Sequence, residues 1–300
     1  MTNFIKKISP HNLSQVVFWL LFLLALALAG YGAYLNQLKT LRENLTFEGT
    51  KLLAPPVKAA AYLVGDLDSG QILLAKNEKV HFYPASLSKL MTAAVVLDNF
   101  SLTDLISVSD YAVSAEGTEG NLEAGEIFTV LDLLKVMLIN SSNDAAIAFE
   151  EAFMKQGKNL VDLMNEKAQQ LGMYNSAFFG STGLDRKGNF TTALDLFLLA
   201  RHLYFGYPVL QEITTLPQAT VFSQNKSMVH ELANTNLLLT SYPNLVLGKT
   251  GTTPFAKECL LTVFEIPQEN DTMKVTIIVL NSEDRFGDTV KLYDWVQNNY

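Results

Sequence analysis

Hydrophobic and polar residues follow two different patterns along this 300-residue chain. Residues 60–64 and 71–75 are short apolar runs separated by the turn formers Asp-Leu-Asp-Ser-Gly, a pattern that predicts a β-hairpin. Three later segments are the best further strand candidates, at 247–252, 258–264 and 275–280. Strand-like segments are therefore expected near both ends of the folded part.

The middle of the chain instead repeats apolar residues at helical spacing. They recur over 87–95 after Ser86, a good N-cap residue, and form a clear stripe over 160–171. Further helices are predicted at 131–139, 145–153, 193–203 and 288–298. This order predicts an α+β fold, in which N- and C-terminal strands complete one antiparallel sheet and a helical subdomain flanks it.

The first 35 residues differ from the rest. Residues 16–35 carry no charge and are long enough to cross a hydrocarbon layer of about 30 Å as a helix. We expect a cytoplasmic N-terminus at 1–15, a single-pass membrane anchor at 16–35, a polar linker at 36–57, and a folded domain at 58–300 outside the cytoplasm. A cleaved signal segment is the alternative, because Ala27-Leu-Ala29 offers a small-x-small cleavage site.

Composition limits the partners. A net charge of −8 without a basic stripe repels phosphates, so nucleic acid is not expected to bind. Cys259 is the only cysteine, which excludes an intrachain disulfide, and its apolar neighbours suggest a buried small hydrophobe. The four histidines lack metal-ligand spacing, so neither a metal site nor a cofactor is expected.

Three short polar motifs carry candidate chemistry. In Ser86-Leu-Ser-Lys89, helical spacing puts a hydroxyl beside an amine that can act as its base only if burial or a nearby positive charge keeps it neutral. Ser141-Ser-Asn143 lies between two predicted helices, where a cap and a turn are the usual explanation. Lys249-Thr-Gly251 falls in a predicted strand, where a glycine lets a substrate backbone approach. Each motif is a weak signal by itself.

In this order, the three motifs match the set of penicillin-binding proteins and class A β-lactamases. The stretch Tyr83-Pro-Ala-Ser-Leu-Ser-Lys-Leu-Met-Thr-Ala93 resembles the active-site segment of low-molecular-weight D-alanyl-D-alanine carboxypeptidases. Other similar segments are Met164–Ala168, Leu171–Met173, Ser181-Thr-Gly-Leu-Asp185, Asp284-Arg-Phe and Leu292-Tyr-Asp-Trp295. The resemblance runs from about residue 58 to the C-terminus and implies a β-lactamase/transpeptidase-like fold and a serine DD-peptidase domain at 58–300.

The resemblance also implies roles for particular residues. Ser86 would attack the carbonyl carbon of the penultimate D-alanine of a peptidoglycan stem peptide, and Lys89 would take its proton. Ser141 would relay a proton to the leaving amine, and Asn143 would hydrogen-bond the substrate amide or Lys89. Lys249 would keep the local field positive, which would hold the first lysine neutral and attract the terminal carboxylate.

Substrate binding is expected at the strand that carries the third motif. Thr250 and Arg285 are the candidates for the terminal carboxylate, since a guanidinium matches a carboxylate with two parallel hydrogen bonds. A surface arginine at a helix start is the alternative for Arg285. Gly251 would provide close approach, and the backbone N–H groups of Ser86 and Thr252 would form the oxyanion hole.

These roles predict a serine-type D-Ala-D-Ala carboxypeptidase of the bacterial cell membrane that trims peptidoglycan and is acylated by β-lactams. Ser142 departs from the pattern that the resemblance implies, because carboxypeptidases commonly have glycine there and class A β-lactamases have aspartate. A class A β-lactamase would need a glutamate-bearing loop. No Glu-x-x-Leu-Asn occurs between Asn143 and Lys249, and Glu231 lies in a predicted strand. A non-catalytic β-lactam sensor is the second alternative, although only about fifteen residues would lie inside the cell to carry an output.

Overall fold

The computed structural model describes residues 53–118, 120–225, 228–268 and 271–300, together with Trp19, Tyr31 and Gly32. Those from residue 53 onward belong to one compact unit, Thr46–Tyr300. The N-terminus predicted at 1–15, the anchor at 16–35 and most of the linker at 36–57 lie outside the described residues. Within the part of the chain that is described, no helix has both the length and the apolar character needed to span a bilayer.

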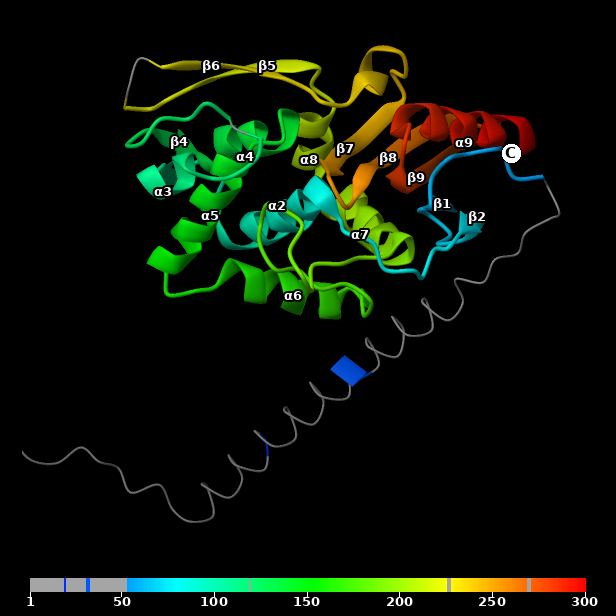
Figure 1. Cartoon of the computed structure of the whole chain (residues 1–300), viewed down its shortest axis with the longest axis horizontal. Coiled ribbons are helices and arrows are strands. Elements are labelled where there is room, and N and C mark those ends of the chain that lie inside the picture. The colour runs from blue at the N-terminus through cyan, green and yellow to red at the C-terminus, as the bar shows by residue number, and fades with distance from the viewer. Residues whose placement is uncertain (1–18, 20–30, 33–52, 119, 226–227, 269–270) are drawn as a thin grey trace, which may run out of the picture. The chain divides into compact units, whose positions relative to one another are not determined.

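A five-stranded antiparallel sheet organises this unit, with strand order β2-β1-β9-β8-β7 (Figure 1). β1 (Ala61–Asp66) and β2 (Ile72–Lys76) form the predicted hairpin. The chain returns to β1 only with β9 (Thr272–Ser282), which pairs with β8 (Lys257–Pro267). β7 (Leu245–Thr253) is the edge strand opposite β2. The sheet is therefore completed by distant segments, as predicted.

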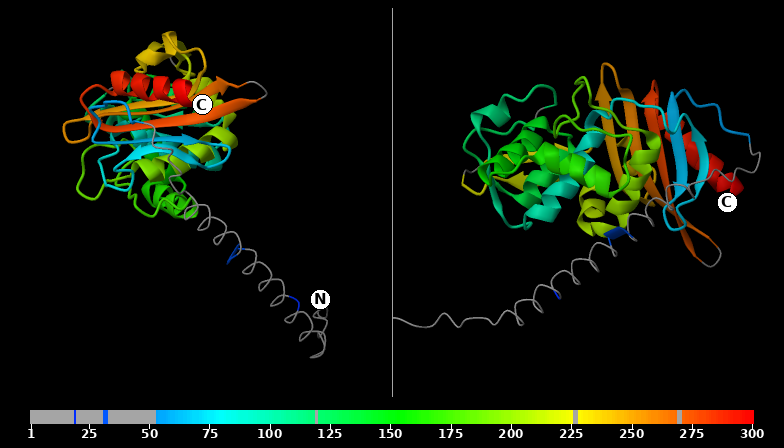
Figure 2. Two further views of the ribbon diagram at one scale, coloured as in Figure 1. Left: turned by 90° about the vertical axis from the view of Figure 1, so that its right-hand side faces the viewer. Right: turned by 90° about the horizontal axis from the view of Figure 1, so that it is seen from below.

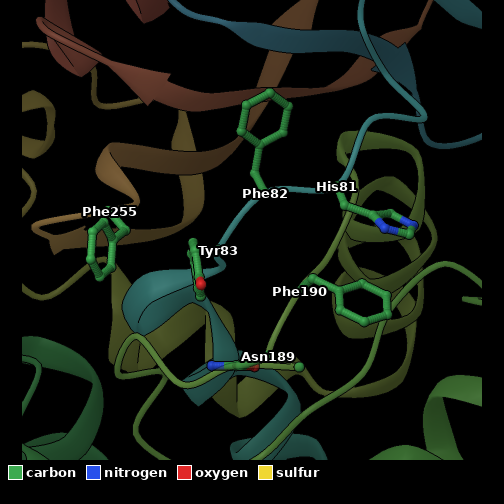
Figure 3. Close-up of a pocket in the computed structure, with 7 residues that line it drawn as sticks. His81, Phe82, Tyr83, Asn189, Phe190 and Phe255 are labelled. Carbon is green, nitrogen blue, oxygen red and sulfur yellow. The ribbon is translucent and has the colours of Figure 1, made fainter.

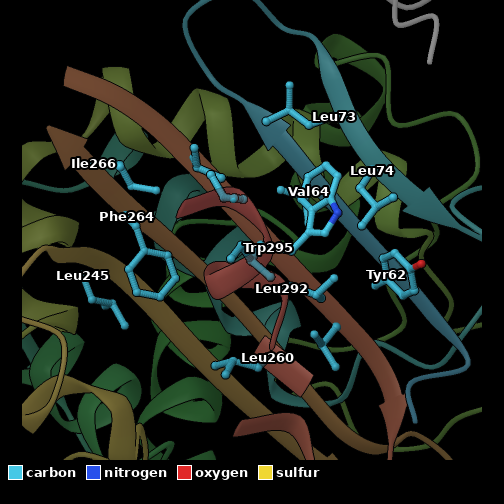
Figure 4. Close-up of a cluster of buried hydrophobic side chains, with 14 of the residues drawn as sticks. Tyr62, Val64, Leu73, Leu74, Leu245, Leu260, Phe264, Ile266, Leu292 and Trp295 are labelled. Atoms are coloured by element: carbon cyan, nitrogen blue, oxygen red, sulfur yellow. The ribbon is translucent and has the colours of Figure 1, made fainter. Parts of the chain in front are cut away.

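Helices cover both faces of the sheet. The C-terminal helix α9 (Arg285–Asn299) packs Leu292 and Trp295 into a buried cluster with Phe264 of β8 (Figure 4). α7 (Ala193–Gly206) packs against β1, β8 and β9. The β1 contact is close, because a Cβ at Gly65 would stand 2.5 Å from the ring of Phe197.

The helical subdomain lies beside the β7 edge (Figure 2). Its four main helices are α2 (Ser88–Asn99), α4 (Val130–Ile139), α5 (Asn143–Lys155) and α6 (Leu160–Gln170). The strand predicted around Glu231 is β6 (Val229–Ala233), but its partner β5 (Gln218–Phe222) was not predicted. Nor was there a prediction for α3 (Asp110–Val113), α8 (Pro208–Thr214) or the ribbon of β3 (Leu105–Ser107) with β4 (Ile127–Thr129). Each of these elements is short.

The α+β architecture predicted from the sequence is confirmed, but one local prediction is wrong. Ser86 does not cap a helix: it is the middle residue of the 3-10 turn η1 (Ala85–Leu87), and α2 begins two residues later without a side-chain cap. Its hydroxyl is therefore not used by the helix end. The cysteine prediction is confirmed, since Cys259 is a fully buried free thiol in β8.

Candidate active site

The turn that carries Ser86 has an unusual backbone. Ala85 has a φ of 48°, in the left-handed region that residues with a Cβ rarely adopt. Ser141 of the second motif has a φ of 67°. Such conformations cost of order 1–3 kcal/mol and persist only where the surrounding structure enforces them. The first lies directly before the predicted nucleophile Ser86, and the second is the predicted proton relay Ser141 itself.

Lys89 is fully buried in the first turn of α2 and its Nζ has three neighbours. The distances are 3.0 Å to Ser86 Oγ, 2.6 Å to Asn143 Oδ1 and 2.9 Å to the carbonyl oxygen of Thr182. The amide and carbonyl oxygens can only accept hydrogen bonds, so they take two N–H groups. A neutral lysine has two N–H groups and one lone pair. Its lone pair is then left to face the Ser86 hydroxyl.

The surroundings of Lys89 favour this neutral form. Burial lowers the pKa of Lys89 from 10.5 to about 7, and the negative charge of Asp144 opposes the shift. The sequence argument expected Lys249 to hold Lys89 neutral, whereas burial is the largest cause in the structure. The general condition set by the motif, that burial or charge must neutralise the lysine, is met.

The second motif connects α4 to α5 and reaches both lysines. Asn143 begins α5, and its Nδ2 donates to the carbonyl oxygen of Glu116 at 2.6 Å while Oδ1 accepts from Lys89. Asn143 was expected to hydrogen-bond either the substrate amide or Lys89, and in the structure it accepts a hydrogen bond from Lys89. The middle residue, Ser142, caps α5 by accepting from the N–H of Ala145 at 3.1 Å. This explains how a serine is accommodated there.

The second lysine lies on the edge strand. Lys249 Nζ donates to Ser141 Oγ at 2.9 Å and to the carbonyl oxygen of Thr250 at 3.0 Å. The side chain is almost wholly buried. Burial, followed by the positive charges of Lys89 and Arg285, lowers the pKa of Lys249 below its usual range. A positive charge on Lys89 therefore favours the neutral form of Lys249.

Gly251 allows the edge strand to pass directly beside the Ser86 turn. A Cβ at this position would stand 2.9 Å from the Cβ of Ala85 and 3.0 Å from the backbone N of Ser86. The sequence argument attributed this glycine to the approach of a substrate backbone. In the structure, the close approach is made by the chain's own Ser86 turn.

The remaining predicted residues line the same strand. Thr250 Oγ1 is hydrogen-bonded to Thr235 Oγ1, in the segment that follows β6. Arg285, the first residue of α9, donates from Nη1 to the carbonyl oxygen of Gly251 at 3.0 Å and to Thr252 Oγ1. Arg285 is thus part of the site region and is not a free surface arginine. Its Nε is buried and has no hydrogen-bond partner among the described residues.

The segment Ser181–Asp185 resembles the family in sequence, but the resemblance assigned no role to its residues. Here it forms a wall of the site: the carbonyl oxygen of Thr182 accepts from Lys89, and a Cβ on Gly183 would stand 1.8 Å from the carbonyl oxygen of Ala85. Asp185 accepts from Thr253 Oγ1 at 2.6 Å and from the backbone N of Phe255 at 2.9 Å. One loop therefore holds the lysine, the serine turn and the end of β7.

Two contributing residues carried no signal in the sequence. Glu116 acts through its backbone oxygen, and a Cβ on Gly117 would stand 2.6 Å from Asn143 Nδ2. Thr235 reaches Thr250 from a loop. Backbone groups and loop threonines are common everywhere, so a sequence pattern cannot single them out.

A serine hydroxyl hydrogen-bonded to a buried lysine of lowered pKa is the arrangement of an activated nucleophile, and the second buried lysine, Lys249, holds the hydroxyl of Ser141. Comparison with known proteins agrees with this class of site. The family model described as D-alanyl-D-alanine carboxypeptidase, peptidase S11, matches residues 48–284. The chain belongs to this family. The β-lactamase/transpeptidase-like fold predicted from the sequence is also confirmed, since solved DD-peptidases superpose on this structure.

The individual relatives differ in their names. D-alanyl-D-alanine carboxypeptidase DacF of Bacillus subtilis is 30% identical over 84% of this chain and 64% of its own length. A D-alanyl-D-alanine endopeptidase of Pseudomonas aeruginosa is 31% identical over 88% of each chain. The crystal structure of the Streptomyces K15 DD-transpeptidase superposes with a TM-score of 0.74 at 25% identity, covering 82% of this chain and 100% of that chain. The chain thus spans less than two thirds of the length of DacF.

Proposed function

We propose that this protein is a serine-type D-Ala-D-Ala carboxypeptidase that removes the terminal D-alanine from peptidoglycan stem peptides through an acyl-enzyme. The observation that carries the proposal is the 3.0 Å contact between Ser86 Oγ and Lys89 Nζ, together with a pKa of about 7 for that lysine. A base with a pKa near the working pH combines a useful neutral fraction with sufficient basicity.

Acylation begins at the Ser86 hydroxyl. Its proton moves to the lone pair of Lys89 as Oγ bonds to the carbonyl carbon of the penultimate D-alanine. The negative oxygen formed in this step is stabilised by the backbone N–H groups of Ser86 and Thr252. Removal of one such donor in other enzymes costs roughly 3–4 kcal/mol of transition-state stabilisation. The close passage of β7 beside the N–H of Ser86 supports this role.

The leaving D-alanine needs a proton and a site for its carboxylate. Ser141 is within hydrogen-bond distance of Lys249 and can pass a proton to the leaving amine. Thr250, Thr252 and Arg285 lie together along β7 and offer hydroxyl and guanidinium donors for the carboxylate. Water then attacks the ester, with Lys89 again as the base. β-Lactams acylate the same serine and act as inhibitors.

One experiment tests the proposal with a matched control. Purified full-length protein is incubated with a fluorescent penicillin and, separately, with a peptide ending in D-Ala-D-Ala. Free D-alanine and penicillin labelling are both expected, and both should disappear in Ser86→Ala. Ser88→Ala should retain both, because Ser88 Oγ has no hydrogen-bond partner among the described residues. Absence of labelling in the wild type would overturn the assignment.

The other candidate activities give different outcomes in the same assay. Labelling without D-alanine release would favour a β-lactam sensor, and rapid hydrolysis of penicillin would favour a β-lactamase. Because named relatives include an endopeptidase and a transpeptidase, a cross-linked dimer and an acceptor amine are also offered. Cleavage of the cross-link or amine transfer that outpaces D-alanine release would contradict a carboxypeptidase.

We further propose that the enzyme works outside the cytoplasm and is held at the bacterial membrane by residues 16–35. The support is the run of twenty uncharged residues in the sequence. After expression in a bacterium, the protein should stay in the membrane pellet after alkaline carbonate extraction and keep its N-terminus. Recovery in the soluble fraction with Gly30 as the first residue would show instead that the segment is a cleaved signal.

A further inference from the structure

Lys89 depends on one loop for part of its hydrogen bonding. The carbonyl oxygen of Thr182 accepts from Lys89 Nζ at 2.9 Å, and Thr182 lies in the loop between α6 and α7. Ser86 and Asn143, the other two neighbours of Nζ, belong to η1 and α5. Those elements hold their residues through regular backbone hydrogen bonds, whereas a loop carbonyl is placed by individual contacts. The contacts that fix this loop therefore affect the lysine.

Glu150, on α5, fixes the start of this loop segment. Its Oε1 accepts a hydrogen bond of 2.7 Å from the backbone N–H of Ser181, the residue directly before Thr182. The carbonyl oxygen of Ser181 accepts from Thr92 Oγ1 of α2 at 2.9 Å. Glu150 lies about two helical turns beyond Asn143, so α5 carries both residues on one face. Side chains of α5 and α2 thus hold both polar backbone groups of Ser181.

The carboxylate of Glu150 acts on Lys89 through the loop and not through its charge. Among the described residues, Asp144 is the charge that raises the pKa of Lys89. A hydrogen bond to a carboxylate is shorter and stronger than one to a neutral acceptor, which suits a half-buried anchor. A charge pair with Arg186 is the competing explanation, because a Cβ on Gly180 would stand 3.9 Å from Arg186 Nη1 and 4.0 Å from Glu150 Oε1.

The other end of the loop is held by contacts that do not involve Glu150. The backbones of Phe82 and Thr191 exchange two hydrogen bonds of 2.9 Å. The ring of Phe190 stacks on that of His81, with the ring centroids 4.3 Å apart (Figure 3). Loss of the Glu150 carboxylate therefore frees the start of the loop and leaves its end in place.

We propose that Glu150 is a positioning residue for Lys89. By accepting the N–H of Ser181, it fixes the carbonyl of Thr182, and this carbonyl turns the lone pair of the lysine toward the Ser86 hydroxyl. The inference rests on the proposed function, in which Lys89 takes the serine proton. When the start of the loop moves away, water reaches the amine. Burial is the largest cause of the lowered pKa of Lys89, so hydration raises that pKa.

The test measures the second-order rate of labelling by a fluorescent penicillin from pH 5.5 to 9. In Glu150→Ala the rate at pH 7 should fall about tenfold, since a small misplacement of a catalytic group is costly, and the rise of the rate with pH should move to higher pH. Glu150→Leu, which keeps the bulk but has no acceptor oxygen, should behave in the same way. Glu150→Gln should stay within about twofold of the wild type at every pH, because its amide oxygen can accept the Ser181 N–H.

Glu212→Ala is the matched control, because Glu212 is an exposed glutamate of α8. Its labelling rate and pH dependence should equal those of the wild type. Thermal unfolding is measured for every variant, so that only folded proteins are compared.

Several results would overturn the inference. One is wild-type labelling in folded Glu150→Ala or Glu150→Leu, and another is a lower rate with an unmoved pH dependence, which indicates a general loss of structure. A Glu150→Gln variant as impaired as Glu150→Ala would assign the effect to the charge, and an equal loss in Glu212→Ala would assign it to acidic charge in general. If the wild type is not labelled at any pH, the proposed function itself fails and the inference falls with it.

Discussion

The pKa of Lys89 gives a sharp prediction about catalysis. At pH 7 a lysine with a pKa of 10.5 is neutral in about one molecule in 3,000, whereas with a pKa of about 7 about half of the molecules carry the neutral base. Burial of this one amine thus raises the reactive fraction roughly a thousandfold, a change of roughly 4–5 kcal/mol between its protonation states. The rate of acylation by a fluorescent penicillin should rise about tenfold per pH unit below 7 and level off above it.

The substitution Asp144→Asn tests whether the rise of the acylation rate with pH reports the titration of Lys89. Among the described residues, the carboxylate of Asp144 is the charge that raises the pKa of Lys89, so its neutralisation should move the rise in acylation rate to lower pH. The backbone N–H of Gly120 donates to Asp144 Oδ2 at 2.8 Å, and it can donate in the same way to the amide oxygen of an asparagine. The assay is the second-order labelling rate from pH 5.5 to 9, with thermal unfolding measured in parallel as a control for folding.

Two results would refute this reasoning. A wild-type rate that is flat from pH 5.5 to 9 would mean that the base does not titrate near 7. If the pH dependence of the labelling rate is unchanged in Asp144→Asn, or moves to higher pH in a folded variant, the titrating group is not Lys89.

Three further predictions follow from the same geometry. Gly251→Ala should lower kcat/KM for D-alanine release about 10- to 100-fold, because its Cβ would push β7 away from the backbone N of Ser86; wild-type kinetics would contradict that contact. Asp185→Asn should lower the acylation rate several-fold while penicillin still binds, since Thr253 Oγ1 loses a charged acceptor; equal rates would show that Asp185 does not position the strand. Because the pKa of Lys89 is lowered in the folded wild type, the unfolded chain binds a proton more readily than the folded chain between pH 7 and 10.5. The free energy of unfolding of the wild type should therefore rise with pH in that window, and this rise should be absent in Lys89→Met. Measured by urea unfolding, the free energy of unfolding should rise about 2 kcal/mol more in the wild type than in Lys89→Met between pH 7 and 9. Equal rises in the two proteins would exclude this contribution of Lys89.

The regular elements could be predicted where hydrophobic periodicity is long enough to read. Helix α6 extends over about three turns, so its one buried face leaves a repeated signal in the sequence, whereas β8 is buried on both faces and shows a continuous apolar run. The ribbons β3–β4 and β5–β6 contain three to five residues per strand. Their pairing depends on neighbouring parts of the fold, including α4, and a pattern that short does not specify it.

The sequence by itself determined which chemical groups this protein brings to its site. The spacing of Ser86 and Lys89 requires no tertiary structure, because residues three apart meet on one side of a helical turn. The order of the three motifs, and the longer family-like segments around them, were sufficient to indicate a serine DD-peptidase. These features are local, and a linear pattern records local features well.

Only the tertiary structure decided how those groups are tuned and assembled. The pKa of Lys89 depends on burial beneath Asn143 and Thr182, which lie 54 and 93 residues away along the chain. Lys249 meets Ser141 across 108 residues, and Asp185 ties its loop to the end of β7. Desolvation and convergence arise from packing between distant segments, so their physical origin lies in the folded chain and not in any short stretch of sequence.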